Sequence, residues 1–148
     1  MREILFRAKT VNNVHWIWGD LFHAGTEPSD GEFAISYWDD EDGWMNENVQ
    51  PGTIGQFTGL TDKNGKRIFE GDIVECVSWN EYFSKDGKPM EPFRRKMFVD
   101  YRKGGFKMVE PMPEPMKDNE WDIICNGDIV IIGNIYDDPQ LIDMKRLG

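Results

Sequence analysis

The chain has 148 residues, with 27 Asp and Glu against 17 Lys and Arg, and a formal net charge of −10. This length suits one compact unit, or one barrel with an amino-terminal extension. The acidic balance opposes non-specific binding to nucleic acid, which depends on cations that release counterions from phosphate. No apolar run approaches the roughly 18–20 residues that cross a bilayer, so we expect no contact with a membrane.

The first 48 residues predict an amino-terminal β extension. Residues 4–8 alternate weakly and predict an edge strand, and the aromatic and β-branched stretches 15–18 and 33–38 predict two more strands. Gly19-Asp20 and Asp42-Gly43 are expected to form turns. We expect these strands to pair with each other or with the region that follows.

Acidic residues concentrate within this extension. Residues 39–42 form one acidic run, and three more acidic side chains lie shortly before it, at positions 27, 30 and 32. Charge runs usually lie in solvated loops, and this is the interpretation we favour. The alternative is an acidic patch that meets a basic partner protein or mimics DNA phosphate.

Glycines and turn formers crowd residues 49–74, and they fix backbone shape more tightly than they fix chemistry. The Asp-Lys-Asn-Gly stretch at 62–65 predicts a type I turn closed by a left-handed residue. Gly71-Asp72 then turns the chain into the β-branched run 73–77. We assign a structural turn role to Gly55, Gly59, Asp62, Gly65, Gly71 and Asp72.

The later part of the chain predicts further strands and one long exposed loop over 82–93. Residues 94–102 alternate as a strand, and Lys103-Gly104-Gly105 predicts a tight hairpin into the next one. The three prolines of 110–119 exclude a central strand there. The remaining predicted elements are strands over 121–125 and 129–136 and a short closing helix over 139–147, capped by Asp138.

Catalytic and metal-binding patterns are absent from the sequence, so we predict no catalytic residue, no metal and no cofactor. The chain has two histidines, His15 and His23, and no nucleophile or phosphate-binding motif accompanies them. Cys76 and Cys125 lie in strand-like apolar runs and are expected to be buried reduced thiols, with a disulfide as the alternative. The repeated Gly-Asp-Ile-Val at 71–74 and 127–130 is interpreted as two strand starts rather than a metal site.

Aromatic side chains are the remaining candidates for binding. We expect most of the six tryptophans to fill the core of a small barrel. Exposed aromatics beside the long loop could form a groove, and the only basic cluster follows directly. That cluster either faces an acidic partner or neutralises acidic neighbours in the same chain. The predicted binding surface comprises Tyr82, Phe83, Phe93, Arg94 and Lys96.

The turn-rich segment resembles the signature of the YopX-like family of phage and prophage proteins. The resemblance is carried by residues 53–60 (TIGQFTGL), 62–65 (DKNG) and 68–74 (IFEGDIV). Residues 2–8 with 16–21 resemble the family's amino-terminal strand and the W-x-x-G-D-L turn that follows it. The resemblance implies a mainly β fold with an SH3-like barrel in the later part.

The end of the chain agrees with this resemblance. Residues 132–141 resemble the family's carboxy-terminal close, which adds Gly133 and Asn134 to the structural turn residues. The match runs through the whole chain in order, and it implies no reaction. We therefore expect an amino-terminal β extension over 1–48 and an SH3-like barrel region over 49–148, or one compact unit overall.

These observations predict a non-enzymatic phage-type protein that acts through protein contacts or self-assembly as a homo-oligomer. The alternative is a nucleic-acid-associated or regulatory SH3-like binding module, in which a local basic strand overcomes the global charge. The chain's start lacks the apolar stretch of a secretory signal. The expected location is the cytosol of a host cell.

Overall fold

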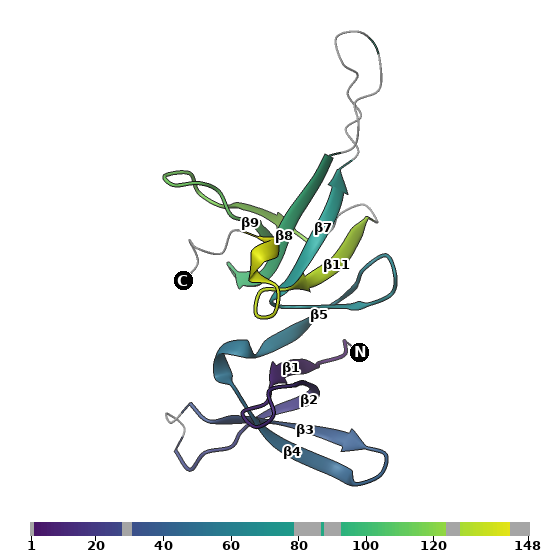
Figure 1. Ribbon diagram of the computed structural model, residues 1–148, viewed down its shortest axis with the longest axis vertical. Helices are drawn as coiled ribbons and strands as arrows, with labels where there is room; N and C mark the ends of the chain where they lie inside the picture. The colour runs from purple at the N-terminus through teal and green to yellow at the C-terminus, as the bar shows by residue number, and fades with distance from the viewer. Residues whose placement is uncertain (1, 28–30, 79–86, 88–92, 124–127, 143–148) are drawn as a thin grey trace. The chain divides into compact units, whose positions relative to one another are not determined.

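A computed structural model of the protein describes residues 2–27, 31–78, 87, 93–123 and 128–142. Within these residues the chain forms antiparallel β-strands and two 3₁₀ turns, with no α-helix (Figure 1). The prediction of a mainly β fold is therefore confirmed. No described helix has the length and apolar character needed to cross a bilayer.

The chain divides into two compact units, Met1–Gly59 and Leu60–Gly148. The first unit thus ends later in the chain than the predicted extension over 1–48. Its strands follow the hydrogen-bonded order β4-β3-β2-β1-β5, and β5 continues past Gly59 to pair with β6. The elements are β1 (Phe6–Lys9), β2 (Trp16–His23), β3 (Phe33–Asp39), β4 (Gly43–Val49), η1 (Pro51–Thr53) and β5 (Gly55–Thr61).

Strand β1 lies inside the sheet, so the prediction of an edge strand is wrong. Phe6 pairs with Gly19 of β2 on one side and with Gln56 of β5 on the other. A weak alternation at the start of a chain does not reveal that a later segment returns to cover the second edge. The core of this unit is formed by Ala8, Ile17, Ile35 and Val49.

Strand β2 changes partners halfway along its length. Its first half, up to Gly19, pairs with β1, and its second half, from Asp20 onward, pairs with β3. A Cβ added at Gly19 would lie 2.1 Å from the carbonyl oxygen of Ser36, so only glycine fits where β3 joins. Gly19-Asp20 is therefore a bend inside an extended strand, and the predicted turn is wrong.

The second unit contains a five-stranded antiparallel sheet in the order β10-β9-β8-β7-β11, with the short strand β6 before it. Lys103 and Gly104, with φ of 54° and 80°, connect β8 to β9 as the predicted tight hairpin. The elements are β6 (Arg67–Phe69), β7 (Asp72–Ser78), β8 (Phe93–Arg102), β9 (Gly105–Glu110), β10 (Asn119–Asp122), β11 (Ile129–Asn134) and η2 (Pro139–Leu141).

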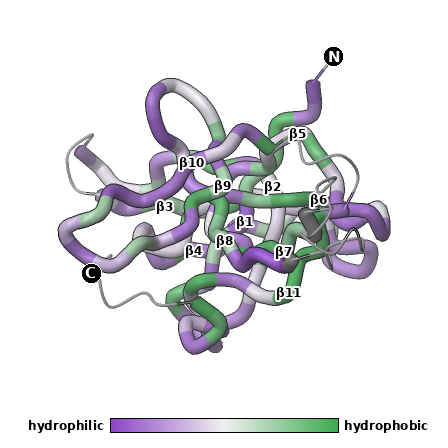
Figure 2. Tube along the Cα trace, turned by 90° about the horizontal axis from the view of Figure 1, so that it is seen from above, coloured by the Kyte–Doolittle hydropathy of each residue, from purple (hydrophilic) through white to green (hydrophobic). Residues whose placement is uncertain are grey.

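Both faces of this sheet are covered by apolar side chains. One face holds a cluster around Val74, Met97 and Val99, and the other a cluster around Ile73 and Phe98. The segment after β11 contributes to the second cluster, and the apolar run of β11 appears green in Figure 2. Strand β8 is therefore apolar on both faces at its centre and polar only toward its ends.

The SH3-like barrel is not confirmed, because neither sheet closes among the described residues. Strands β10 and β11 are the two edges of the second sheet, and the only hydrogen-bonded neighbour of β6 is β5. The predicted closing helix is a single 3₁₀ turn over Pro139–Leu141, and its remainder lies outside the described residues. Asp138 does not cap it, because its carboxylate accepts a hydrogen bond from the backbone N–H of Asn134 instead.

Candidate functional site

One outward face of the first unit carries four tryptophans, Trp16, Trp18, Trp38 and Trp44, which we call the tryptophan face. Side chains two residues apart on a strand share a face, so Trp16 and Trp18 project from β2 on the same side. Trp38 and Trp44 are directly opposite each other on β3 and β4. Their exposed fractions are 49% for Trp18, 59% for Trp38 and 67% for Trp44, whereas Trp16 is partly buried.

The tryptophan face surrounds an open groove at the point where β2 and β3 separate. Pairing between these strands begins at Asp20 and Ser36, so the preceding part of β2 and the following part of β3 diverge. The groove has a volume of about 480 Å³ and is lined by all four tryptophans together with Asp20, Ser36 and their neighbours. Trp38 and Trp44 meet edge to face, with ring centroids 5.6 Å apart.

One carboxylate lines this groove, and an acidic turn follows Trp38 in the chain. Asp20 is exposed in its lining, and the acidic residues 39–42 connect Trp38 to the strand that carries Trp44. The carboxylate of Asp39 accepts hydrogen bonds from the backbone N–H groups of Asp42 and Glu41, and these bonds lower its pKa. Asp39 is therefore ionised at neutral pH, and it shapes the turn that we predicted as a solvated loop.

A hydroxyl, an imidazole and a carboxylate line up beside the groove. The Thr10 hydroxyl lies 3.2 Å from Nδ1 of His15, and Nε2 of His15 lies 3.7 Å from Glu47. Thr10 is only 1% exposed, and its hydroxyl donates to the carbonyl of Asn12. A nucleophile must reach its substrate, so we interpret this arrangement as a brace for the turn between β1 and β2.

Glu47 also accepts a hydrogen bond from the phenol of Tyr37, at 2.6 Å. This hydrogen bond, together with burial and the negative charge of Glu47, raises the pKa of Tyr37 to about 12. The phenol is therefore neutral throughout the physiological range. It holds the Glu47 side chain against the inner side of the β3–β4 hairpin.

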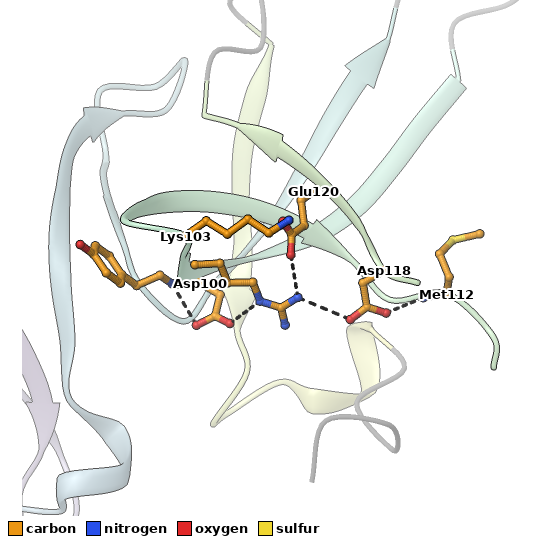
Figure 3. Close-up of polar contacts among 7 residues, drawn as sticks. Asp100, Lys103, Met112, Asp118 and Glu120 are labelled. Atoms are coloured by element: carbon orange, nitrogen blue, oxygen red, sulfur yellow. Dashed lines mark hydrogen bonds and ion pairs between the residues drawn. The ribbon is translucent and has the colours of Figure 1, made fainter. Parts of the chain in front are cut away.

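The second unit carries an ion-pair network around Arg102 (Figure 3). The guanidinium lies 2.9 Å from Asp100, 3.1 Å from Glu120 and 3.7 Å from Asp118, and Lys103 also reaches Glu120. Burial alone would lower the pKa of Arg102, but its carboxylate partners raise it. Hydrogen bonds from Lys103 and Arg102 lower the pKa of Glu120. Because each cation of this network pairs with a carboxylate, we interpret the network as a structural link between the strands and the loop that carry these residues.

The remaining cations of β8 and β9 are mostly paired in the same way. Arg94 lies 2.9 Å from Glu75, Arg95 lies 3.1 Å from Glu110, and Lys107 pairs with Asp122. Arg94 and Arg95 of the basic cluster therefore neutralise acidic neighbours in the same chain, which is one of the two alternatives that the sequence left open. Such pairing leaves few of these cations available to track a phosphate backbone.

The structure locates only part of the predicted binding surface. Tyr82 and Phe83 lie outside the described residues, and Phe93 is placed only as the first residue of β8. Arg94 is paired with Glu75, whereas Lys96 is exposed and has no ion pair with a described residue. The structure does not bring these five residues into a described site.

Sequence reasoning missed the tryptophan face because it assigned most tryptophans to the core. None of the five described tryptophans belongs to a buried cluster, and Trp121 is also exposed. Two signals were present in the sequence. Trp16 and Trp18 are two residues apart in a strand, and Trp38 and Trp44 flank an acidic turn, which places them opposite each other on a hairpin.

Asp62 joins the turn between β5 and β6 to strand β11. Its buried carboxylate, 6% exposed, accepts hydrogen bonds from the backbone N–H groups of Asn64, Lys66 and Ile131. Burial alone would raise the pKa of Asp62, but these three bonds and the Lys66 charge together lower it. Gly65 completes the turn with a φ of 80°. This carboxylate therefore adds to the backbone hydrogen bond from the N–H of Lys63 to the carbonyl of Ile129, which joins the same two segments.

Gly71 and Asp72 connect β7 to its neighbours. Gly71 has a φ of 92°, its N–H donates to Val99, and its carbonyl accepts from Ile135. The carboxylate of Asp72 accepts a hydrogen bond of 2.7 Å from the N–H of Phe69. Gly71 and Asp72 therefore fix the backbone at the start of β7 through these hydrogen bonds, whereas Gly127 of the second pair lies outside the described residues.

Gly55, Gly59, Gly133 and Asn134 complete the predicted turn residues. Gly55 pairs with Arg7 at the start of β5, and Gly59 has a φ of 89° near its end. A Cβ at Gly133 would lie 2.5 Å from the Asp138 carboxylate. The side-chain oxygen of Asn134 accepts hydrogen bonds from the next turn, at residues 136 and 137.

The described residues contain no group of three or more His, Cys, Asp or Glu placed to hold a metal ion. Cys76 is buried and disulfide-bonded, so the prediction of a reduced thiol is wrong at this position. A reduced thiol requires a reducing compartment, which the residue pattern around Cys76 does not establish. Cys125 lies outside the described residues.

Comparison with solved structures finds a crystal structure of protein EF1440 from Enterococcus faecalis, with a TM-score of 0.53. The match covers 97% of this chain and 100% of that one at 20% sequence identity, so the likeness concerns the fold alone. No curated protein matches the chain. The family model described as YopX protein matches residues 5–143, nearly the whole sequence. The chain therefore belongs to the YopX family.

Proposed function

We propose that this protein is a non-catalytic binding protein of phage type, which contacts a partner protein through the tryptophan face. The observation that carries the proposal is the set of three tryptophans, Trp18, Trp38 and Trp44, each exposed by about half or more around one groove. Tryptophan dominates the energetically important positions of protein interfaces. A contiguous exposed aromatic surface is unusual on a chain that acts alone.

The nucleic-acid alternative receives less support from the charges. The first unit contains three Lys and Arg and ten Asp and Glu, which gives it a formal net charge of −7. In the second unit, Arg94, Arg95, Arg102 and Lys107 are paired with carboxylates of the same unit. A surface that binds phosphate needs free cations, so protein contacts explain the tryptophan face better.

The test uses the purified full chain as bait in a lysate of its bacterial host. Proteins captured by the wild type are identified, purified and titrated back against the wild type and a Trp38→Ser, Trp44→Ser variant. If both rings are interface anchors of about 2 kcal/mol each and their losses add, the affinity falls by roughly 700-fold. Light scattering of the bait alone shows whether the partner is a second copy of the chain.

A Tyr101→Ser variant is the matched control. Tyr101 lies in the second unit, is 55% exposed and packs edge to face on Phe106. Removing it deletes a comparable exposed ring without touching the tryptophan face, so the captured partner should bind as it does to the wild type. If the tryptophan variant and the wild type bind the captured partner with equal affinity, the tryptophan face is not the binding surface and the proposal is wrong.

A further inference from the structure

We infer that the tryptophan face recognises an arginine-bearing, unstructured segment of a partner protein, and this inference rests on the proposed function. The groove is not simply apolar, because an acidic side chain accompanies its rings. Asp20 lies in the lining and the acidic turn 39–42 lies between Trp38 and Trp44 in the chain. An aromatic surface with a carboxylate in its lining and an acidic turn next to it in the chain is complementary to a cation with an apolar stem.

The first unit already contains this interaction within its own chain. The guanidinium of Arg7 lies 4.9 Å from the ring centroid of Trp16, and the ammonium of Lys9 lies 5.6 Å from it. No described cation lies over Trp18, Trp38 or Trp44. The ring of Trp16 is thus already in contact with cations of its own chain, while the other three rings are exposed to solvent.

The charge balance selects the partner. With three cations against ten acidic residues in this unit, a second copy of the chain would bring like charge to the groove, and a nucleic acid would bring phosphate. A cationic segment is attracted by both the rings and the carboxylates. Arginine is favoured over lysine because its planar guanidinium stacks on indole and pairs with a carboxylate through two N–H groups.

The groove also suits an extended peptide more than a folded surface. It opens where β2 and β3 diverge, so its walls come from Trp18 of β2 on one side and from Trp38 and Trp44 of the β3–β4 hairpin on the other. A side chain entering between the walls meets indole rings on both sides. Asp20, two residues beyond Trp18 on the same face, lies beside that entry.

The experiment titrates the full chain with three short peptides that differ only in one residue type: Gly-Ser peptides containing two arginines, two lysines or two citrullines. Binding is followed by calorimetry and tryptophan fluorescence. We expect the arginine peptide to bind, and the lysine peptide to bind several-fold more weakly. The citrulline peptide should bind at least about tenfold more weakly than the arginine peptide, because citrulline keeps the shape of the arginine side chain but carries no charge.

Two variants locate the site. Trp38→Leu with Trp44→Leu should weaken the arginine peptide about tenfold or more, and Asp20→Asn should weaken it by about two- to fivefold. Tyr101→Ser is the control and should leave binding unchanged. Salt should weaken binding to the wild type more than binding to Asp20→Asn, because the carboxylate contributes a screened attraction.

Each outcome decides the inference. Equal binding of the arginine and citrulline peptides, or no arginine-peptide binding up to about 1 mM, overturns it. A single-stranded oligonucleotide that binds more tightly than the arginine peptide also overturns it. If the tryptophan variants no longer bind a partner captured by the wild type, yet the arginine peptide does not bind the wild type, the proposed function is supported and the inference of an arginine-bearing partner is rejected. If neither measurement responds to the variants, both fall.

Discussion

Replacement of Asp62 by alanine tests whether one buried carboxylate holds the second unit together. The carboxylate accepts hydrogen bonds of 2.9 Å from Asn64, 2.9 Å from Lys66 and 3.1 Å from Ile131. The first two donors belong to the turn itself, where water can replace the lost acceptor. The third donor belongs to β11, so its loss weakens the link between the turn and the sheet, while the backbone hydrogen bond from Lys63 to Ile129 remains.

The expected cost follows from these three bonds. A hydrogen bond to a charged acceptor contributes about 1.5–3 kcal/mol when its partner is left buried, and the two turn bonds contribute about 0.5–1 kcal/mol each. Asp62→Ala should therefore reduce the free energy of unfolding by about 2.5–5 kcal/mol. Asp62→Asn keeps the shape and one acceptor oxygen, and should lose about half as much.

The assay is urea-dependent hydrogen exchange of β7 and β8 amides, which reports unfolding of the second unit by itself. Asp122→Asn is the control, because this exposed residue only pairs with Lys107 and should change stability by less than about 1 kcal/mol. An Asp62→Ala variant within about 0.5 kcal/mol of the wild type would refute the reasoning.

The pH dependence of stability gives an independent check on Asp62. Its pKa is lower in the folded protein than in the unfolded chain, so its contribution is fully present above the unfolded value of about 3.9. The contribution disappears as the pH falls through the folded pKa. The wild type should therefore lose stability more steeply than Asp62→Ala below about pH 4. Parallel curves for the two proteins would contradict the assignment.

Three further predictions concern the turns, the phenol of Tyr37 and the charges. In thermal melts, Gly71→Ala should destabilise the protein by about 1–3 kcal/mol more than Gly65→Ala does. Both glycines have positive φ, but only at position 71 would the added Cβ lie 3.0 Å from the Tyr136 ring. Tyr37 should ionise with a pKa of about 12 in absorbance titrations, and the stability that it provides should disappear between about pH 10 and 12; Tyr37→Phe should abolish that step. Random duplex DNA at about 150 mM salt should bind no more tightly than about 10⁻⁴ M in fluorescence anisotropy, and micromolar binding would revive the nucleic-acid alternative.

Local turn chemistry was predictable from the sequence because it depends on a few adjacent residues. The Asp62–Gly65 turn and the Lys103-Gly104 hairpin both follow from residue types that tolerate left-handed backbone or accept backbone hydrogen bonds. The partners of Asp62 were only half predictable. Its bonds to Asn64 and Lys66 are local, whereas its bond to Ile131 spans 69 residues.

Strand pairing was harder to predict, since an apolar alternation does not specify which strand covers an edge. The edge position expected for residues 4–8 failed because β5 returns to pair with β1. The turn expected at Gly19 failed for a similar reason: the glycine serves a close approach by Ser36 rather than a reversal of the chain. A glycine in a sequence predicts that space or unusual φ is needed, but it does not say which.

The tryptophan face has a structural explanation that competes with the functional one. Cross-strand aromatic pairs stabilise hairpins by about 0.2–1 kcal/mol, which could account for Trp38 and Trp44 at the end of β3–β4. The same explanation does not extend to Trp18, which is 49% exposed and has no ring contact with a described residue.

Trp18→Ser is therefore the variant that separates the two explanations. If the face is a binding surface, the free energy of unfolding of this variant should lie within about 0.5 kcal/mol of the wild-type value. Its affinity for the captured partner should nevertheless be at least about tenfold lower. Trp38→Ser should lower both stability and affinity, because it removes a hairpin pair as well as a wall of the groove. A Trp18→Ser variant that binds as the wild type does would leave only the hairpin pair, and the tryptophan face would then be a device for folding.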